Sequence, residues 1–388
     1  MRENRSIALI GHSGSGKTTL AEAMLFAAGA RSRRGRVEDG TSTMDFAAEE
    51  VQRHISIHLS VAALVDHGES RCTILDCPGY FDFVGEVVAG LRGADMAALV
   101  VETASELPVG AELTWQHRRE AGLPAAVVVN KMDRENADWT ATLTMLRQKL
   151  GQQVQPVLLP IGAADGLRGV VDVLRQRAYV YQDGVMQEAE VPADLADQVS
   201  QARTELTELA AEQDEETLDR YLSEGMLPQA DLEAGVRRAI IAGDLVPTFA
   251  VSALRAVGVQ PLLNLLLALA PTAGERTLPA ARDASGAPIS LRGGDDLPVV
   301  GQVIQTLADP YVGRLSVLRL FQGTLCPDSM LLNRSRGAQE RIGQIFLLKG
   351  KEQQPVTAAL PGDVVAIAKL SATRTGDTLC ASLNAWPS

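Results

Sequence analysis

Residues 11–18 read Gly11-His12-Ser13-Gly14-Ser15-Gly16-Lys17-Thr18 and directly follow the apolar run 7–10, Ile-Ala-Leu-Ile. This run predicts a buried strand, and the apolar spacing of residues 19–26 predicts a helix. The glycines therefore lie on a strand-to-helix turn, which is the context that the pattern G-x-x-x-x-G-K-[ST] requires. A Gly-rich turn at a strand end is the alternative interpretation, and both flanking elements disfavour it.

Such a turn can form a phosphate cradle, because small residues let backbone N–H groups close around a phosphate at a helix N-terminus. We expect Lys17 to reach the β- and γ-phosphate oxygens and the Thr18 hydroxyl to bind Mg²⁺. The candidate nucleotide-binding residues of this loop are His12, Ser13, Gly14, Ser15, Gly16, Lys17, Thr18 and Thr19.

Composition limits the class of protein. With 388 residues, the chain is long enough for two or three domains that each bury a core. Hydrophobic residues make up 46% and charged residues 22%, which argues against a disordered or fibrous protein. The four cysteines lack C-x-x-C spacing, so we expect neither a zinc site nor a disulfide framework. A net charge of −12 disfavours non-specific binding to nucleic acids, although a local patch can still dock on a ribonucleoprotein.

The sequence contains no candidate membrane span, since its longest apolar helical stretch, 262–270, is too short to cross a bilayer. Residues 1–5 lead only into a short apolar strand, so no targeting segment is expected. We therefore expect a cytoplasmic monomer with reduced thiols and no membrane partner.

A second motif follows the predicted strand 71–75, which ends in Asp76-Cys77-Pro78-Gly79. A carboxylate at the C-terminal end of a strand lies where open α/β sheets bind ligands. We expect Asp76 to hold Mg²⁺ through a water molecule and the Gly79 N–H to contact a γ-phosphate. Alone, D-x-P-G is a common turn, and the phosphate loop upstream favours the functional interpretation.

Between these motifs, residues 31–50 are polar and carry arginines followed by acidic residues, which predicts a long functional loop. Residues 53–57 return to alternating apolar residues, as in a strand. Ser56 is then either a strand-edge hydroxyl or a second magnesium ligand. Because the segment 33–56 has little apolar surface, we expect it to be ordered only when γ-phosphate and Mg²⁺ are both bound.

A third motif concerns the base. The predicted strand 125–129 runs into Asn130-Lys131-Met132-Asp133. The Asp133 carboxylate can accept both N1–H and the exocyclic amine of guanine, a donor pair that adenine lacks, while Asn130 and Lys131 brace the base and the phosphate loop. After the predicted strand 247–251, the backbone of Ser252-Ala253-Leu254 could contact guanine O6. The order of the motifs favours a guanine nucleotide over a chance surface turn.

Strands alternate with helices up to about residue 270, which predicts an α/β fold with a mostly parallel sheet and helices on both faces in residues 1–275. From about 155 to 246, a strand pair near 179–190 and an acidic helical run at 195–222 predict an inserted α+β subdomain. Residues 276–298, rich in Pro and Gly, predict a linker. Short alternating strands in 299–388 predict a small antiparallel β-barrel.

These segments resemble the translational GTPases, most closely elongation factor G and its paralogous elongation-factor-G-like lineage. The matching segments, in the family's order, are GHSGSGKTTL, STMDF, DCPGYFDFVGE, NKMD, VSAL, DPYVGRLSVLRLFQGTL, LPGDVVAIAKL and TGDTL. The resemblance covers nearly the whole chain and implies binding and hydrolysis of GTP with Mg²⁺, with the ribosome as partner. Because the chain ends with the barrel, the three C-terminal domains of elongation factor G are expected to be absent.

Three positions depart from the family's pattern. Arg53-His54-Ile55-Ser56 replaces Arg-Gly-Ile-Thr, Gly14 replaces an aspartate linked to a monovalent-cation site, and Tyr80 replaces the catalytic histidine. The resemblance assigns catalytic roles to Lys17, Gly79 and Tyr80 and metal binding to Thr18, Ser56 and Asp76. Tyr80 and Gly14 favour an alternative, a module that switches between GTP and GDP shapes with little hydrolysis. A small-molecule kinase is disfavoured by NKMD and by the barrel.

The acidic helical run also suggests a partner. Glu205, Glu208 and Glu212 recur at three- and four-residue spacing, which places them on one helix face. By resemblance, the corresponding helix of elongation factor G meets the basic C-terminal domain of the ribosomal stalk protein. The alternative is an ordinary solvated face.

Overall fold

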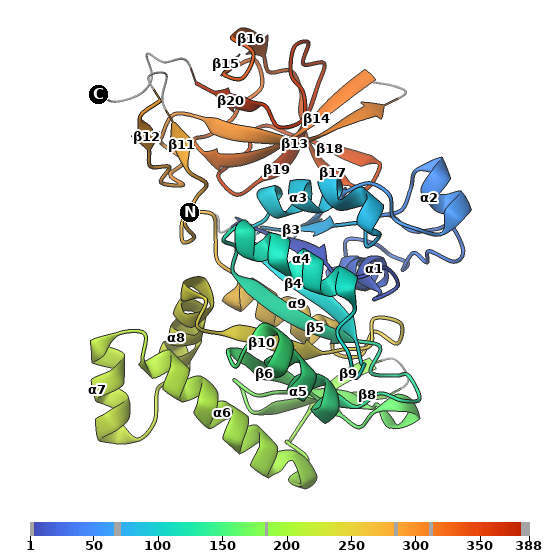
Figure 1. Cartoon of the computed structure of the whole chain (residues 1–388), viewed down its shortest axis with the longest axis vertical. Coiled ribbons are helices and arrows are strands. Elements are labelled where there is room, and N and C mark those ends of the chain that lie inside the picture. The colour runs from blue at the N-terminus through green and yellow to red at the C-terminus, as the bar shows by residue number, and fades with distance from the viewer. Residues whose placement is uncertain (1–3, 66–70, 183–184, 283–285, 310–312, 382–388) are drawn as a thin grey trace.

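The computed structural model describes residues 4–65, 71–182, 185–282, 286–309 and 313–381. Its N-terminal part is organised around parallel strands in the order β3-β1-β4-β5-β10-β6 (Figure 1). In that order, their bounds are Arg71–Asp76, Asn4–Ile10, Met96–Glu102, Ala125–Asn130, Val246–Ala250 and Val154–Ile161. At the β3 edge, β2 (Ser60–Val65) adds an antiparallel strand. The predicted mostly parallel sheet is thus confirmed.

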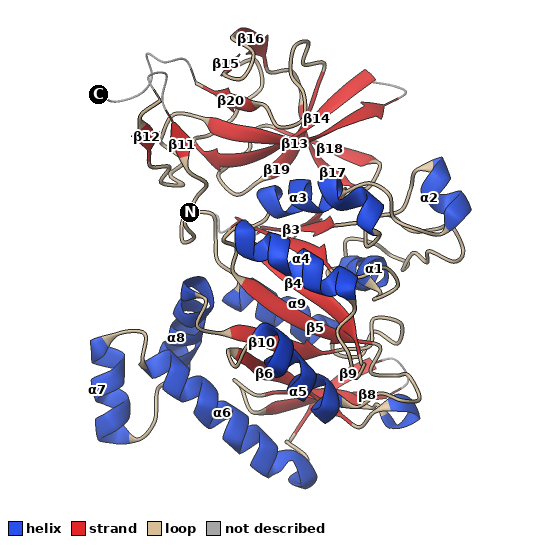
Figure 2. Ribbon diagram, viewed as in Figure 1, coloured by secondary structure: helices blue, strands red, loops and turns tan. Residues whose placement is uncertain are grey.

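Helices cover both faces of this sheet, as predicted. In Figure 2, α4 (Val109–Glu120) and α5 (Trp139–Leu150) lie in front of the strands, and α9 (Val259–Leu269) lies behind them. On its own side α9 contacts α1 (Lys17–Ala27), whereas α4 contacts α3 (Val84–Gly93). None of the helices in the described ranges combines the length and apolar character that crossing a membrane requires.

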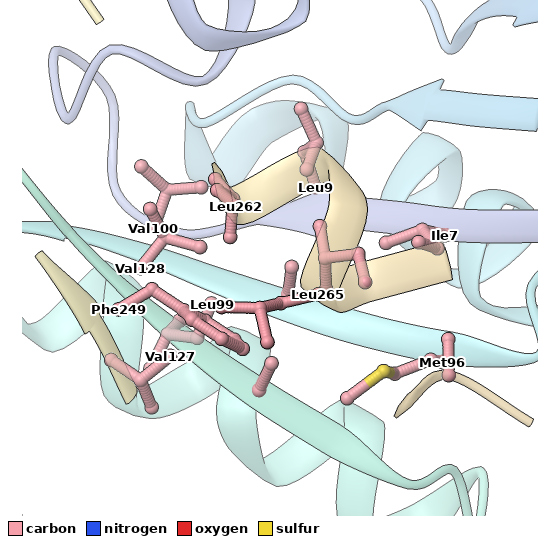
Figure 3. Packing of buried hydrophobic residues seen from close by; sticks show 14 of the residues in the cluster. Ile7, Leu9, Met96, Leu99, Val100, Val127, Val128, Phe249, Leu262 and Leu265 are labelled. Carbon is pink, nitrogen blue, oxygen red and sulfur yellow. The ribbon is translucent and has the colours of Figure 1, made fainter. Parts of the chain in front are cut away.

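The core lies between the sheet and these helices. Strands covered on both faces are rich in apolar residues, and β1 and β5 are buried at every residue. Each fully buried large aliphatic side chain contributes about 1.5–3 kcal/mol relative to exposure. This packing fixes the carboxyl ends of the strands, where the sequence motifs lie. The buried side chains labelled in Figure 3 are Ile7, Leu9, Met96, Leu99, Val100, Val127, Val128, Phe249, Leu262 and Leu265.

Beyond β6, antiparallel strands extend the sheet, and three helices follow. The strands are β7 (Gly169–Asp172), β8 (Arg177–Gln182) and β9 (Val185–Ala189). The helices are α6 (Ala196–Ala211), α7 (Glu215–Glu224) and α8 (Gln229–Ala242). The acidic run 195–222 is therefore two helices, because Asp214 begins a new one by accepting a hydrogen bond from the Thr217 N–H at 2.8 Å. β6 pairs with β10, so residues 154–161 belong to the parallel sheet. The limits of the inserted subdomain, about 155–246, stay a prediction.

The C-terminal part consists of antiparallel strands that form the predicted barrel-like domain. Their order is β18-β17-β19-β14-β13-β20-β15-β16. From β13 to β20 the bounds are Val300–Asp309, Gly313–Gln322, Met330–Asn333, Ala338–Arg341, Ile345–Lys349, Glu352–Val356, Val364–Ala368 and Thr378–Cys380. The described residues between α9 and β13 contain only the short pair β11 (Ala281–Arg282) and β12 (Pro288–Ile289).

A buried ionic cluster joins this domain to the parallel sheet. Arg319 on β14 donates to the carboxylate of Asp95, which precedes β4, and both side chains are completely buried. Arg276 donates to the same carboxylate at 3.1 Å through Nε. A second pair, Arg71 and Asp363, lies 2.9 Å apart. These contacts fix the barrel against the N-terminal half of the chain.

The segment between α1 and β2 differs from the prediction. A helix, α2 (Ala48–Arg53), begins inside the predicted loop, and residues 53–57 do not form the expected strand. Two local features explain the difference. The buried Glu50 carboxylate accepts from the N–H groups of Ile57 and His58 at 3.0 Å, so a side chain replaces a neighbouring strand as their partner. His54 ends α2 in the left-handed conformation, with φ 53°.

Candidate functional site

A cavity of about 510 Å³ lies where β1, β3 and β5 end. All three motifs contribute to its walls, together with the segment that precedes β2. The predicted site residues that line it are Ser13, Gly14, Gly16, Lys17, Thr18, Thr19, Ser56, Gly79, Tyr80, Asn130, Lys131, Asp133 and Leu254.

Lys17 is held in the phosphate loop by two carbonyl groups. Its buried Nζ donates to Gly11 O and His12 O, each at 3.0 Å, and burial lowers the pKa of the ammonium. An ammonium has three donors, so one is left for a phosphate oxygen. A Cβ at residue 79 would lie 2.5 Å from this Nζ and 2.6 Å from Ser13 N, which explains why a glycine approaches the loop here.

The three predicted metal ligands lie together. Thr18 Oγ1 donates to Asp76 Oδ2 at 2.7 Å and lies 3.0 Å from Ser56 Oγ. The other carboxylate oxygen, Asp76 Oδ1, is buried and has no hydrogen-bond partner in the described part of the chain. Burial and the nearby Asp45 raise the pKa of Asp76 to about 7. Because Mg²⁺ prefers oxygen ligands and often binds through water, this set of donors fits it.

Asp45 is a further acidic residue at the site, outside the three sequence motifs. It lines the cavity with only 4% of its surface exposed. Burial raises the pKa of its carboxyl to about 6, although a hydrogen bond with Ser56 opposes the shift. In the sequence, Asp45 belongs to the STMDF segment that matches the family, and this is the signal that could have identified it. A second buried carboxylate beside Asp76 adds negative charge where a cation would sit.

The third motif braces the opposite end of the cavity. Asn130 joins two loops, because its Nδ2 donates to Ser15 O at 3.0 Å and its Oδ1 accepts from Ala253 N at 2.9 Å. Lys131 Nζ donates to Gly14 O and to Glu102 Oε2. Asp133 Oδ1 is buried and has no hydrogen-bond partner among the described residues. A carboxylate that is already positioned and lacks a donor suits the N1–H and amine of guanine.

Five predicted nucleotide-binding residues do not line the cavity: His12, Ser15, Asp76, Ser252 and Ala253. Of these, His12 is exposed and lines a neighbouring, mostly apolar cavity of about 330 Å³. The other four are buried behind the cavity wall. Ser252 N donates to Val257 O at 3.0 Å and Ala253 N to Asn130 Oδ1, so both of these N–H groups already have partners within the protein.

Comparisons with known proteins agree with this geometry. Residues 2–272 match the family model for the elongation factor Tu GTP binding domain, and residues 298–382 match that for elongation factor G domain 2. The chain belongs to the translational GTPases. It is 35% identical over 395 residues to the elongation factor G-like protein of two Mycobacterium tuberculosis strains, CDC 1551 / Oshkosh and ATCC 25618 / H37Rv, covering 97% of this chain and 54% of each relative.

A crystal structure from Thermus thermophilus is also similar to this translational GTPase. The two share 34% sequence identity with a TM-score of 0.88, and the match covers 100% of this chain and 55% of the other. The chain thus spans about half the length of the relatives it matches. Family and fold agree with the resemblance found in the sequence.

In this translational GTPase, Tyr80 lies between two cavities. It precedes the short 3₁₀ helix η1 (Phe81–Phe83) and lines both the motif-bearing cavity and the apolar one beside it. Its side chain is accessible, since 43% of the residue's surface is exposed. Rotation of the side chain could therefore bring the hydroxyl toward either cavity.

Proposed function

We propose that this translational GTPase binds GTP and GDP with Mg²⁺ and hydrolyses GTP on the ribosome. One observation carries the proposal: the three motifs converge on one cavity, with Asp133 in its wall at the base end and Asp76 buried behind its wall at the phosphate end. Asp76 and Asp133 each have a buried carboxylate oxygen without a hydrogen-bond partner among the described residues. The oxygen of Asp76 can accept from a metal-bound water, and that of Asp133 can accept from guanine. The proposal includes a monomer that works in the cytoplasm.

In the proposed reaction, the protein mainly positions groups and stabilises charge. Lys17 and the backbone N–H groups of the phosphate loop hold the β- and γ-phosphates, and the Gly79 N–H contacts the γ-phosphate. Thr18, Ser56 and, through water, Asp76 would hold Mg²⁺, which neutralises charge that develops on the phosphate oxygens. Tyr80 orients the attacking water through its hydroxyl.

A second candidate is a module that changes shape between GTP and GDP but hydrolyses hardly at all. Tyr80 favours it, because a tyrosine hydroxyl cannot serve as a general base in the way that a neutral imidazole can. Gly14 favours it too, since it supplies no carboxylate beside the phosphates.

The deciding experiment measures turnover of GTP by the full chain with and without ribosomes. Hydrolysis that is slow alone and faster with ribosomes supports the proposal. Tight GTP binding with no turnover under either condition supports the switch module instead. ATP competing as well as GTP for the site would contradict both.

Tyr80→Phe is expected to slow ribosome-stimulated hydrolysis, because it removes the hydroxyl and keeps the ring. Tyr80→His should retain or raise the rate, since an imidazole can also orient water. Single-turnover hydrolysis of bound GTP with ribosomes measures both. Phe81→Ala, which changes an exposed neighbour, is the control. If Tyr80→Phe were as fast as the parent, Tyr80 would only pack against its neighbours.

Reversing the charge of Glu208 and Glu212 to Lys is expected to slow association with ribosomes, because charges at the rim of an interface act mainly on association rates. Both are exposed, whereas Glu205 pairs with Arg147 of α5 at 3.4 Å and is left out of the test. Stopped-flow association across a salt series measures the effect. Each single reversal is compared with Glu188→Lys, which makes the same change in net charge at an exposed position on β9. Rates that respond to neither substitution nor salt would assign this face to solvent.

A further inference from the structure

The loop that follows β10 is held from outside the cavity by strands that lie beyond β6. Residues 251–258 connect β10 to α9, and Leu254 is the residue of this loop that lines the cavity. Gly258 ends the loop, and its N–H donates to the hydroxyl of Tyr181 on β8 at 3.1 Å. The two residues are 77 positions apart, and β8 belongs to the antiparallel strands that extend the parallel sheet (Figure 1).

Close packing accompanies this hydrogen bond. A Cβ at residue 258 would lie 3.0 Å from Cγ1 of Val170 on β7 and 2.9 Å from Ala250 O, so a glycine lets the loop approach these strands. Gly258 also precedes α9 directly, and N–H groups at the start of a helix have no partner within it. The phenol oxygen of Tyr181 therefore supplies an acceptor that the helix itself cannot provide.

Arg255 makes a second connection from the same loop. Its Nη1 donates to Ala164 O at 3.3 Å, and its Nε lies 4.0 Å from Asp133 Oδ2. Ala164 lies between β6 and β7 and donates through its own N–H to Met132 O at 2.8 Å. Arg255 also donates to Asp165, whose side chain is fully exposed, so this bond adds little. The contact with Asp133 is an ion pair without a hydrogen bond, which leaves Oδ2 able to accept from a base.

We propose that Tyr181 and Arg255 are positioning residues for the guanine base. Neither side chain lines the cavity, so each acts through a group that does. Tyr181 holds the loop that carries Leu254 and whose backbone faces O6 of the base, and Arg255 orients the Asp133 carboxylate toward the N1–H and the 2-amino group. The inference rests on the proposed binding of guanine nucleotides. It adds the strands beyond β6 to the elements that select the base.

Equilibrium titration with GDP and with inosine diphosphate tests the two roles, because hypoxanthine keeps O6 and N1–H and lacks only the 2-amino group. Tyr181→Phe removes one hydroxyl and should weaken both nucleotides equally, by about three- to tenfold, since both carry O6. Arg255→Met should weaken GDP by about threefold, as expected for a partly exposed ion pair. It should weaken inosine diphosphate less, because that base has no amino group to donate to Asp133.

Two substitutions on β8 serve as matched controls. Tyr179→Phe removes a hydroxyl two positions before Tyr181, on the same face of the strand, where a hydrogen bond with Arg175 is its contact. Arg177→Met removes a charge from an exposed pair with Glu190. Both variants should bind GDP and inosine diphosphate as the parent does.

The outcomes are distinguishable. A parent that binds neither nucleotide withdraws the proposed function and this inference with it. If the parent binds, unchanged affinities in Tyr181→Phe or in Arg255→Met overturn the role of that residue alone. Tighter binding of GDP by Arg255→Met would show that the guanidinium competes with guanine for Asp133, and an equal loss for both nucleotides would show that it does not act on the amino contact. Either result overturns its positioning role, as does an equal loss in the controls.

Hydrogen exchange without nucleotide provides a readout that does not depend on binding. In Tyr181→Phe the Gly258 N–H loses its acceptor, so we expect residues 251–258 to exchange faster than in the parent. The buried strand β5 should exchange at the parent's rate, which shows that the fold is intact. Equal protection of residues 251–258 in the two proteins would overturn the idea that Tyr181 holds this loop.

Discussion

Asp133→Asn is expected to reverse the base preference of the site, weakening GTP and strengthening xanthosine triphosphate. Asp133 Oδ1 is buried and lacks a partner in the described structure, while Oδ2 lies 4.0 Å from Arg255 Nε. An amide in place of the carboxylate would present a donor to the guanine amine, so two donors would face each other. Xanthine has an oxygen at that position and could accept from the new amide.

The expected loss of GTP affinity is about 10²-fold or more, because an unpaired buried polar group costs on the order of 1–3 kcal/mol and two groups are affected. Equilibrium competition between GTP and xanthosine triphosphate measures it. Asp165→Asn is the matched control, since Asp165 contacts the same Arg255 at 3.0 Å but does not line the cavity. Unchanged GTP affinity in Asp133→Asn would refute the role of this carboxylate.

Asp95→Ala is expected to destabilise the protein by about 3–5 kcal/mol, the range found when one partner of a buried ion pair is removed. Asp95 and Arg319 are both fully buried, and Arg276 shares the same carboxylate. The substitution leaves two buried guanidinium groups without that counter-charge. The ion pair that is lost joins the barrel to the parallel sheet, so we expect the barrel to separate or unfold first.

Urea unfolding followed by fluorescence and circular dichroism measures this change. Arg341→Ala breaks the exposed pair with Asp328, and its effect should stay below about 1 kcal/mol. Adding Arg319→Met to Asp95→Ala should recover part of the loss, because one uncompensated charge is then removed. If Asp95→Ala stayed within about 1 kcal/mol of the parent, the cluster would not be what holds the two parts together.

The sequence by itself was enough to determine the fold class and to predict the proposed nucleotide site, because both depend on short, contiguous patterns. A strand, a glycine-rich turn and a helix within residues 7–26 define the phosphate loop. Asp76 and Asp133 follow directly after β3 and β5, and parallel strands bring their carboxyl ends to one edge. Alternation of strands and helices was enough to predict the parallel sheet, and short strands with Gly and Pro between them predicted the barrel.

Tertiary structure decided the contacts between segments that no local pattern links. Arg34 meets Ala253 across 219 positions, and Arg319 meets Asp95 across 224. Residues 53–57 alternate as a strand would, but Glu50 takes the backbone N–H groups that a neighbouring strand would have bonded. His12 belongs to the phosphate-loop motif, yet its side chain lines the neighbouring cavity. In each case the partner is set by packing in three dimensions, and periodicity along the chain carries no information about it.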